Sequence, residues 1–275
     1  MRSIFGGVAL VGLVAASTAC LPNPPPSHVV IVIEENHSES AIMGNAAAPY
    51  MNGLAHSGAQ LSDFSAITHP SLPNYLAMFA GSTEGVTSDA CPAPGSPFTA
   101  PSIGGELIAG AKTFAGYSED LPAVGSTQCS NGSYQRKHNP WSYFADVPAA
   151  SNQPFTSFPH DFAQLPTVSY VVPNQLHDMH DGTIAQADTW LQTNLDAYAQ
   201  WAMTHNSILI VTWDEDDYTG TNHVATFMTG QPVRPGVYPA RYDHYSLLRT
   251  LEDLYALPTH AGAAGTATHL DACWN

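Results

Sequence analysis

The sequence predicts an α/β fold with a mostly parallel central sheet. Three apolar runs, at 28–36, 167–182 and 207–217, end in polar residues. This pattern is typical of strands that are buried on both faces of a parallel sheet. Stretches with helical patterning alternate with the runs, as in parallel α/β folds. The expected helices lie at about 46–57, 72–80, 101–111, 186–205 and 245–256.

The size and charge of the chain limit its class and its partners. With 275 residues, of which 44% are hydrophobic, the chain can bury the core of one domain. Seven Lys and Arg residues face 23 Asp and Glu residues, and the formal net charge is −16. Because such a surface repels nucleic acid and anionic membranes, we expect no nucleic-acid binding. An anionic substrate must therefore be bound by a metal ion or by a few basic groups within the site.

The N-terminus has the pattern of a secretory signal peptide. Arg2 precedes an apolar stretch at 4–16, and small residues follow at a cleavage position after Ala19. The apolar stretch is too short for a stable membrane span. Acylation at Cys20 is the alternative, and it would give a lipid-anchored protein. The expected organisation is a signal peptide at 1–19, a Pro-rich spacer at 20–27 and a single domain at 28–275.

Export from the cell would allow disulfides to form among the four cysteines. Cys91 and Cys129 both lie in Gly-, Pro- and Ser-rich loops of the segment 82–160. We expect these two to pair. Cys20 and Cys273 would then join the two ends of the chain, unless cleavage or acylation removes Cys20.

Each of the three predicted strands ends in side chains that can bind a metal or move a proton. These groups lie at 34–37, 177–181 and 214–217. Because the carboxyl ends of parallel strands meet at one edge of a sheet, we expect the three groups to converge on one crevice.

Two of these groups have the composition of a cation site. Asp214 and Glu215 begin a run of four carboxylates, which repel one another unless a divalent cation offsets the charge. Glu35 and Asn36 add oxygen ligands that suit Mg²⁺, Ca²⁺ or Mn²⁺, and Zn²⁺ becomes suitable if a histidine joins them. The alternative for the acidic run is a solvated turn.

Ser71 lies between Pro70 and Pro73, where an extended segment gives way to a predicted helix. This position predicts that Ser71 is the N-cap of the helix. A helix N-terminus is also a favourable place for an anion, so the same geometry suits a nucleophile that attacks phosphate. Position alone leaves both interpretations open.

Basic and imidazole side chains provide candidates for a phosphate-binding site. Arg136, Lys137 and His138 are adjacent in an acidic chain, which favours a phosphate contact over a plain surface position. His180, in "HDMHDG", is a candidate metal ligand, phosphate contact or general acid, and a loop hydrogen-bond network is the alternative. His244 begins a helical stretch, where a capping or core role fits the pattern equally well.

The ordered motifs resemble the bacterial phosphoesterase family of secreted acid phosphatases and phospholipases C. The resemblance covers nearly the whole mature chain and runs through "IEENH", "THPSLPNYLAMFAGST", "GYSEDLPAVGS", "RKHNPW", "VVPNQLHDMHDG" and "TWDEDD". It implies an alkaline-phosphatase-like α/β/α sandwich with a metal-assisted Ser or Thr nucleophile. In related nucleotide phosphodiesterases a Phe-Pro-Asn tripeptide follows the nucleophile. Here Leu72-Pro73-Asn74 follow Ser71, so the resemblance aligns Ser71 and not Thr68 with it.

The resemblance also implies roles for individual residues. Ser71 would attack phosphorus, and His180 or His244 would protonate the leaving oxygen. One divalent cation (Ca²⁺, Mg²⁺, Mn²⁺ or Zn²⁺) would be the cofactor. Its implied ligands are Glu35, Asn36, Asp214 and Glu215. The implied phosphate contacts are Asn74, Lys137, His138 and Asp181.

These features together predict a secreted, metal-dependent acid phosphatase that acts on phosphate monoesters through a phosphoserine intermediate. Phosphoinositides, sugar phosphates and nucleotides are all candidate substrates. The chain is shorter than the large phospholipases C, which favours a compact phosphatase, and a phospholipase C-type phosphodiesterase is the alternative enzyme. A secreted calcium-binding module is the alternative outside enzymes. We expect a monomer.

Overall fold

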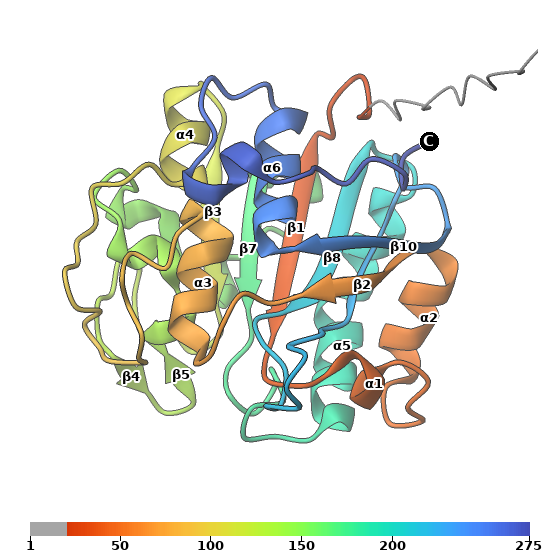
Figure 1. Ribbon diagram of the computed structural model, residues 1–275, viewed down its shortest axis with the longest axis horizontal. Helices are drawn as coiled ribbons and strands as arrows, with labels where there is room; N and C mark the ends of the chain where they lie inside the picture. Colours follow the sequence, from red (N-terminus) through yellow and green to blue (C-terminus); the bar gives the residue numbers. More distant parts are fainter. Residues whose placement is uncertain (1–20) are drawn as a thin grey trace, which may run out of the picture.

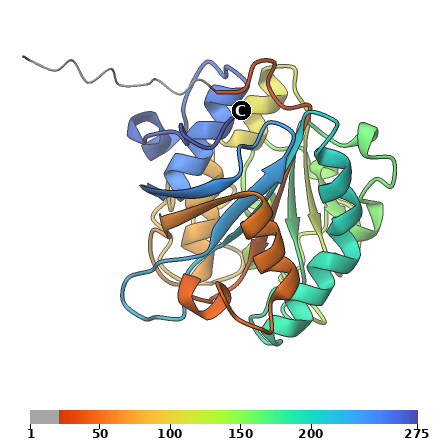
Figure 2. The same ribbon diagram turned by 90° about the vertical axis from the view of Figure 1, so that its right-hand side faces the viewer.

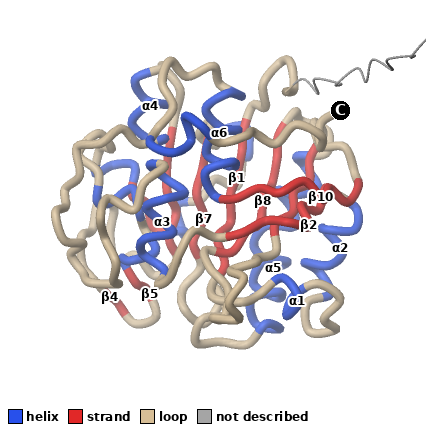
Figure 3. The backbone as a smooth tube through the Cα atoms, viewed as in Figure 1, coloured by secondary structure: helices blue, strands red, loops and turns tan. Residues whose placement is uncertain are grey.

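A mixed eight-stranded sheet forms the centre of the protein (Figures 1 and 3). The computed structural model describes residues 21–275, so the predicted signal peptide and Cys20 lie outside the described residues. The strands of the sheet are β1 (His28–Glu34), β2 (Ala59–Ser65), β3 (Phe114–Ser118), β6 (Asn152–Pro154), β7 (Val168–Val172), β8 (Ser207–Trp213), β9 (Thr226–Gly230) and β10 (Gly236–Asp243). A separate hairpin pairs β4 (Ser130–Asn131) with β5 (Tyr134–Gln135).

The strand order in the sheet is β10-β2-β9-β8-β1-β7-β3-β6. From β8 to β6 all neighbouring strands pair in parallel. Strand β9 runs antiparallel to both β8 and β2, and β10 pairs in parallel with β2. The predicted mostly parallel sheet is therefore confirmed, with one antiparallel strand inserted beside β8.

Helices cover both faces of the sheet, which gives the expected α/β/α sandwich (Figure 2). On one face α2 (Pro49–Ser57) packs against α5 (Ile184–Ala202). On the other face α3 (Ser71–Ala80), α4 (Ile103–Ala109) and α6 (His244–Leu254) pack together. A short helix, α1 (Glu39–Ile42), follows the first strand.

Strand β1 lies in the middle of the core, between β7 and β8. Its apolar residues from Val29 to Ile33 are all fully buried. In the ladder Ile31 lies opposite Tyr170 on one side and Ile210 on the other. Burial on both faces explains why the run is continuously apolar instead of alternating.

The segment 82–160 is largely irregular, and a disulfide joins two of its loops. Cys91 and Cys129 are bonded, with their Cα atoms 5.7 Å apart. The predicted pairing is therefore present in the structure. Cys273 is buried, and its predicted pairing with Cys20 stays a prediction.

Among residues 21–275, none of the helices has both the length and the apolar character needed to cross a membrane.

Candidate active site

Loops at the carboxyl edge of the sheet bring the predicted nucleophile and metal ligands together. Glu35 and Asn36 follow β1, Asp214 and Glu215 follow β8, and Ser71 begins α3. Ser71 Oγ lies 3.1 Å from Glu35 Oε2 and 3.2 Å from Glu215 Oε1. The backbone N–H of Asn36 donates to Asp214 Oδ1 over 3.2 Å. These five residues form one cluster.

The register of β1 against β8 explains this convergence. Glu34 pairs with Trp213 at the end of the ladder, so the residues that follow leave the sheet side by side. The N–H of Asp214 still donates to the oxygen of Glu34 over 3.1 Å. Asn36 then takes a φ of +48°, a left-handed conformation that asparagine adopts more readily than most residues.

Ser71 is the first residue of α3, and Pro70 is the N-cap. The expectation that Ser71 itself caps the helix is therefore wrong, and its hydroxyl is directed at the carboxylates instead. Asn74 fixes the turn before the helix. Its Oδ1 accepts the N–H groups of Ile67 and Thr68, both at 3.0 Å, while its Nδ2 is 3.3 Å from Glu215 Oε2. Asn74 thus holds the turn against the carboxylate of Glu215.

The donor set of this cluster fits a divalent cation. The side-chain amide atom of Asn36 that faces the cluster lies 3.0 Å from Glu35 Oε2, 3.1 Å from Asp214 Oδ1 and 3.3 Å from Glu215 Oε1. In one orientation of the Asn36 amide, its nitrogen donates to the three carboxylates. In the other orientation its oxygen faces them, and a cation between the oxygens would be needed to stabilise that arrangement. Asp214 Oδ2 is buried without a hydrogen-bond partner. Three carboxylates, an amide and a hydroxyl are the ligands that Mg²⁺, Ca²⁺ and Mn²⁺ prefer.

The same carboxylates have raised pKa values. Burial, and then the neighbouring carboxylates, raises the pKa of Glu35 and of Asp214 well above the usual range. Burial raises the pKa of Glu215 to about 7, although the Ser71 hydrogen bond opposes this shift. Because a cation stabilises the ionised form, binding of one would lower all three values.

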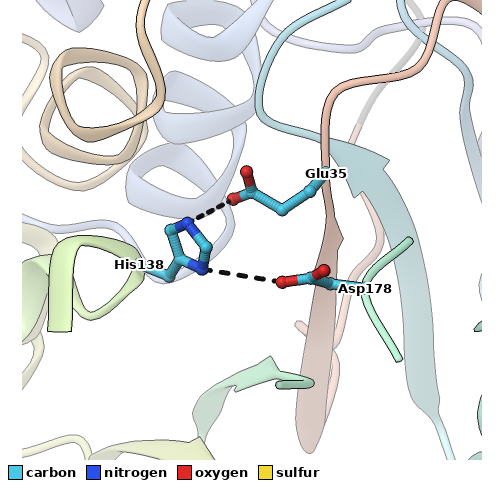
Figure 4. A group of neighbouring side chains, drawn as sticks. All are labelled: Glu35, His138 and Asp178. Atoms are coloured by element: carbon cyan, nitrogen blue, oxygen red, sulfur yellow. Dashed lines mark ion pairs between the residues drawn. The ribbon is translucent and has the colours of Figure 1, made fainter. Parts of the chain in front are cut away.

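Glu35 also belongs to a second buried cluster, with His138 and Asp178 (Figure 4). The imidazole of His138 lies between the two carboxylates, with Nε2 3.1 Å from Glu35 Oε1 and Nδ1 3.6 Å from Asp178 Oδ2. Tyr75 donates to the same Glu35 oxygen over 2.5 Å and stacks on the His138 ring. One ligand atom from each of the three cluster residues lies within 4.8 Å of the others, so this cluster could hold a metal ion. Because this cluster includes a histidine nitrogen, it suits Zn²⁺ better than the all-oxygen cluster around Ser71 does.

His138, a predicted phosphate contact, is 1% exposed, so it contacts Glu35 and does not face solvent. Lys137, the neighbouring predicted phosphate contact, lies with Nζ 2.9 Å from Asp89 Oδ2. Lys137 is more accessible, with 13% of its side chain exposed.

The two predicted general acids differ in their positions. The His180 ring lies 6.3 Å from that of His138, and its Nδ1 is 2.8 Å from Asp181 Oδ1. His244 is fully buried, and its Nε2 donates to the backbone oxygen of Asp214 over 2.7 Å. Burial lowers the pKa of His244 to about 4. His244 therefore supports the Asp214 loop as a neutral imidazole, whereas His180 is 27% exposed beside the clusters.

Sequence reasoning missed three residues of the site. Asp178 lies in the quoted "HDMHDG" motif but was not expected to be a ligand. His69 lies two positions before Ser71, and its Nδ1 is 2.6 Å from Glu215 Oε2. Asp89 lies in an irregular loop. A signal existed for the first two, because Asp178 lies in a motif with several groups able to bind a metal and His69 lies two positions before the predicted nucleophile.

Comparisons with known proteins show which proteins the chain is similar to. A family model described as "Phosphoesterase family" matches residues 45–258. The chain is 49% identical to the phosphatidylinositol-3-phosphatase of Mycobacterium tuberculosis, covering 100% of this chain and 90% of that protein. It is 28% identical to the phosphate-repressible acid phosphatase of Penicillium chrysogenum, covering 89% of this chain and 65% of that protein.

A solved structure supports the fold. A protein in the alkaline phosphatase superfamily from Vibrio parahaemolyticus matches with a TM-score of 0.62 at 12% identity, covering 90% of this chain and 71% of that one. The predicted alkaline-phosphatase-like sandwich is therefore confirmed.

Proposed function

Because this chain belongs to the phosphoesterase family and is a hydrolase of phosphoric esters, we propose that it is a metal-dependent acid phosphatase acting through a phosphoserine. The observation that carries this proposal is the position of Ser71 Oγ, within 3.2 Å of two carboxylates that also face Asn36. A serine that only capped a helix would not be directed into a set of cation ligands.

Glu35, Asn36, Asp214 and Glu215 would hold the cation. When bound there, a divalent cation supplies Lewis-acid stabilisation of phosphoryl oxygens and lowers the pKa of the serine hydroxyl. Ser71 Oγ forms the new bond to phosphorus, and the bond from phosphorus to the leaving oxygen breaks. The hydroxyl proton of Ser71 is released to solvent, because a bound cation would also favour the ionised forms of its two carboxylate partners, Glu35 and Glu215. Water then hydrolyses the phosphoserine and regenerates the hydroxyl.

His180 is the proposed acid for the leaving oxygen, because it is exposed beside the site while His244 is fully buried. Lys137 is the proposed electrostatic contact for the phosphoryl oxygens. His138 lies between the carboxylates of Glu35 and Asp178, and we propose that His138 and Asp178 orient the Glu35 carboxylate. The mycobacterial relative is named for phosphatidylinositol 3-phosphate, so phosphoinositides are the first substrates to test.

The experiment compares hydrolysis of p-nitrophenyl phosphate, p-nitrophenylphosphorylcholine and phosphatidylinositol 3-phosphate by the purified protein. Each is measured after chelation and after single divalent cations are added back. We expect release of phosphate from the two monoesters, and only with a cation. Faster cleavage of the phosphorylcholine diester would favour the phospholipase C-type alternative. No turnover with any cation, together with tight Ca²⁺ binding, would favour the calcium-binding module.

The proposal also includes export. In it, residues 1–19 are removed and residues 28–275 act as one catalytic domain, released as a monomer. The intact mass of the protein recovered from culture medium tests cleavage after Ala19. Recovery of the protein in the membrane fraction, with a mass increased by acyl chains at Cys20, would instead show a lipid anchor.

A further inference from the structure

The carboxylate of Asp89 accepts from two hydrogen-bond donors, a backbone N–H in the first turn of α3 and the ammonium of Lys137. Its Oδ1 accepts the backbone N–H of Leu72 over 3.0 Å, and its Oδ2 lies 2.9 Å from Nζ of Lys137. Leu72 directly follows Ser71, so both donors lie beside the proposed nucleophile. Asp89 lies in the irregular segment that follows α3, and its side chain contacts the first turn of that helix.

These two donors suit a phosphoryl group. The first-turn N–H groups of a helix attract anions, and the helix dipole adds to this attraction. Pro73 has no N–H, so Leu72 supplies one of the few donors in the first turn of this ten-residue helix. Lys137 is one of only seven basic residues in the chain, and its charge acts on Glu35 and Glu215. In a site rich in carboxylates, it is the positive group available to an incoming phosphate.

The Asp89–Lys137 contact is not needed to hold the two segments together. Cys91 lies two positions after Asp89 and is bonded to Cys129. The backbone oxygen of Cys129 accepts the N–H of Arg136, which precedes Lys137, over 2.9 Å. Because the disulfide joins these segments, the Asp89 side chain, which is 31% exposed, can rotate toward solvent without the loop moving away.

We infer that Asp89 is an internal competitor of the substrate's phosphoryl group and so lowers the affinity of the site for phosphate. In the substrate-free protein its carboxylate neutralises Lys137 and accepts the Leu72 N–H, and an incoming phosphoryl group must displace it. The free-energy cost of displacing Asp89 is the same for every substrate, so Asp89 lowers affinity without changing the preference between substrates. This inference rests on the proposed function and specifies what occupies that site before a substrate binds.

The test measures binding of inorganic phosphate by calorimetry to the metal-loaded protein and three variants. Asp89→Asn should bind phosphate about fivefold more tightly, because a partly exposed ion pair no longer competes. Lys137→Met should bind it more weakly. Asp217→Asn is the matched control, since it removes the same charge from an exposed position near Asp214 and should leave the affinity within about twofold.

The decisive result is that Asp89→Asn and Lys137→Met change the affinity for phosphate in opposite directions. If Asp89→Asn and Lys137→Met both weaken phosphate binding, Asp89 merely supports Lys137 and the inference is wrong. A crystal structure of the wild-type protein with inorganic phosphate gives a measure that does not depend on folding of a variant. In it, Asp89 Oδ1 should have left the Leu72 N–H, and an unchanged contact with phosphate bound would overturn the inference.

Steady-state kinetics provides a second readout. The value of kcat/KM for p-nitrophenyl phosphate should rise in Asp89→Asn and stay unchanged in Asp217→Asn, because only the first variant removes the competitor. An unchanged kcat/KM in Asp89→Asn would contradict the inference while leaving the phosphatase proposal intact. Conversely, a wild-type protein without turnover would defeat the proposed function, and the phosphate-binding comparison would still judge the role of Asp89.

Discussion

Ser71 Oγ and Glu35 Oε2 lie 3.1 Å apart although the two residues are 36 positions apart in the chain. The contact joins the first residue of α3 to the first residue after β1. Glu35 is fully buried and its other carboxylate oxygen accepts from Tyr75. The carboxylate therefore has a fixed orientation, and it fixes the direction of the Ser71 hydroxyl in turn.

Replacing Ser71 by alanine should lower kcat for p-nitrophenyl phosphate by about 10³-fold or more, because the attacking oxygen is removed. The fold should persist, since alanine favours helix and Ser71 is not the N-cap. Steady-state kinetics and a circular dichroism melt measure the two effects. Thr68→Ala is the matched control in the same loop. Near-normal activity in Ser71→Ala, combined with loss in Thr68→Ala, would mean that the nucleophile has been misassigned.

Removing the cation should lower both activity and the melting temperature. Glu35, Asp214 and Glu215 lie within one cluster, and without a cation they must either repel one another or become protonated. A ligand that binds only the folded state also stabilises it by mass action. Asp214→Asn, which removes a ligand charge with little change in shape, should weaken metal affinity and rate together. Full activity after exhaustive chelation, with no metal found by elemental analysis, would contradict this mechanism.

The three strands that the sequence predicts, β1, β7 and β8, are all buried on both faces, although the sequence did not predict β3 and β9, which are also buried. Strand β1 and strand β8 are apolar along most of their length, so their residues alone identify them. Strand β10 is mostly exposed and β2 is half polar, so neither has an apolar run. Their pairing depends on contacts between segments far apart in the chain, which local patterning does not contain.

The residues of the site also divide into those that local patterning predicts and those that depend on long-range contacts. Asp214 and Glu215 directly follow a buried strand, and topology brings the ends of parallel strands together. Asp89 has no such signal. Its position beside Ser71 depends on the path of an irregular loop and on the Cys91–Cys129 bond. The disulfide could be predicted from the sequence, but the side chain that it brings to the nucleophile could not.

The disulfide should contribute substantially to stability. Cys91 and Cys129 are 38 positions apart, and closing a loop of this length stabilises a protein by about 4 kcal/mol in the chain-entropy model. The double variant Cys91→Ser with Cys129→Ser should therefore unfold at a lower urea concentration than the wild type. Its phosphate affinity should also fall, because the loop that carries Lys137 loses its tether. Equal urea midpoints for the two proteins would show that the bond is not a structural constraint.

A pair of buried glutamates outside the active-site cluster should make stability fall as pH rises. Glu252 in α6 accepts the N–H of Ala261 over 2.7 Å, and Glu106 in α4 accepts the hydroxyl of Thr259 over 2.6 Å. The Oε2 atoms of both glutamates are buried without a hydrogen-bond partner. A proton on one carboxyl would let it donate to the other and supply the missing bond.

Burial raises the pKa of Glu252 to about 8, the charge of Glu106 adds to this shift, and Arg249 opposes it. Burial also raises the pKa of Glu106, where His260 lowers it and Asp146 raises it. The usual glutamate value is 4.5, so between pH 4.5 and about 8 the folded state binds more protons than the unfolded state. The free energy of unfolding contributed by the pair is therefore greatest below pH 4.5 and is lost as pH rises toward 8.

Glu252→Gln tests this dependence. A glutamine can donate to Glu106 and accept from Ala261 at any pH, so the variant should lose less stability than the wild type between pH 5 and pH 8. The melting temperature of the variant relative to the wild type should therefore rise by about 3 °C or more over this range. Carboxylates of the active site also titrate, but they are common to both proteins and cancel in the difference. Glu84→Gln, in a partly exposed loop position, is the control and should show no trend. A constant difference between Glu252→Gln and the wild type from pH 5 to pH 8 would mean that the two glutamates share no proton.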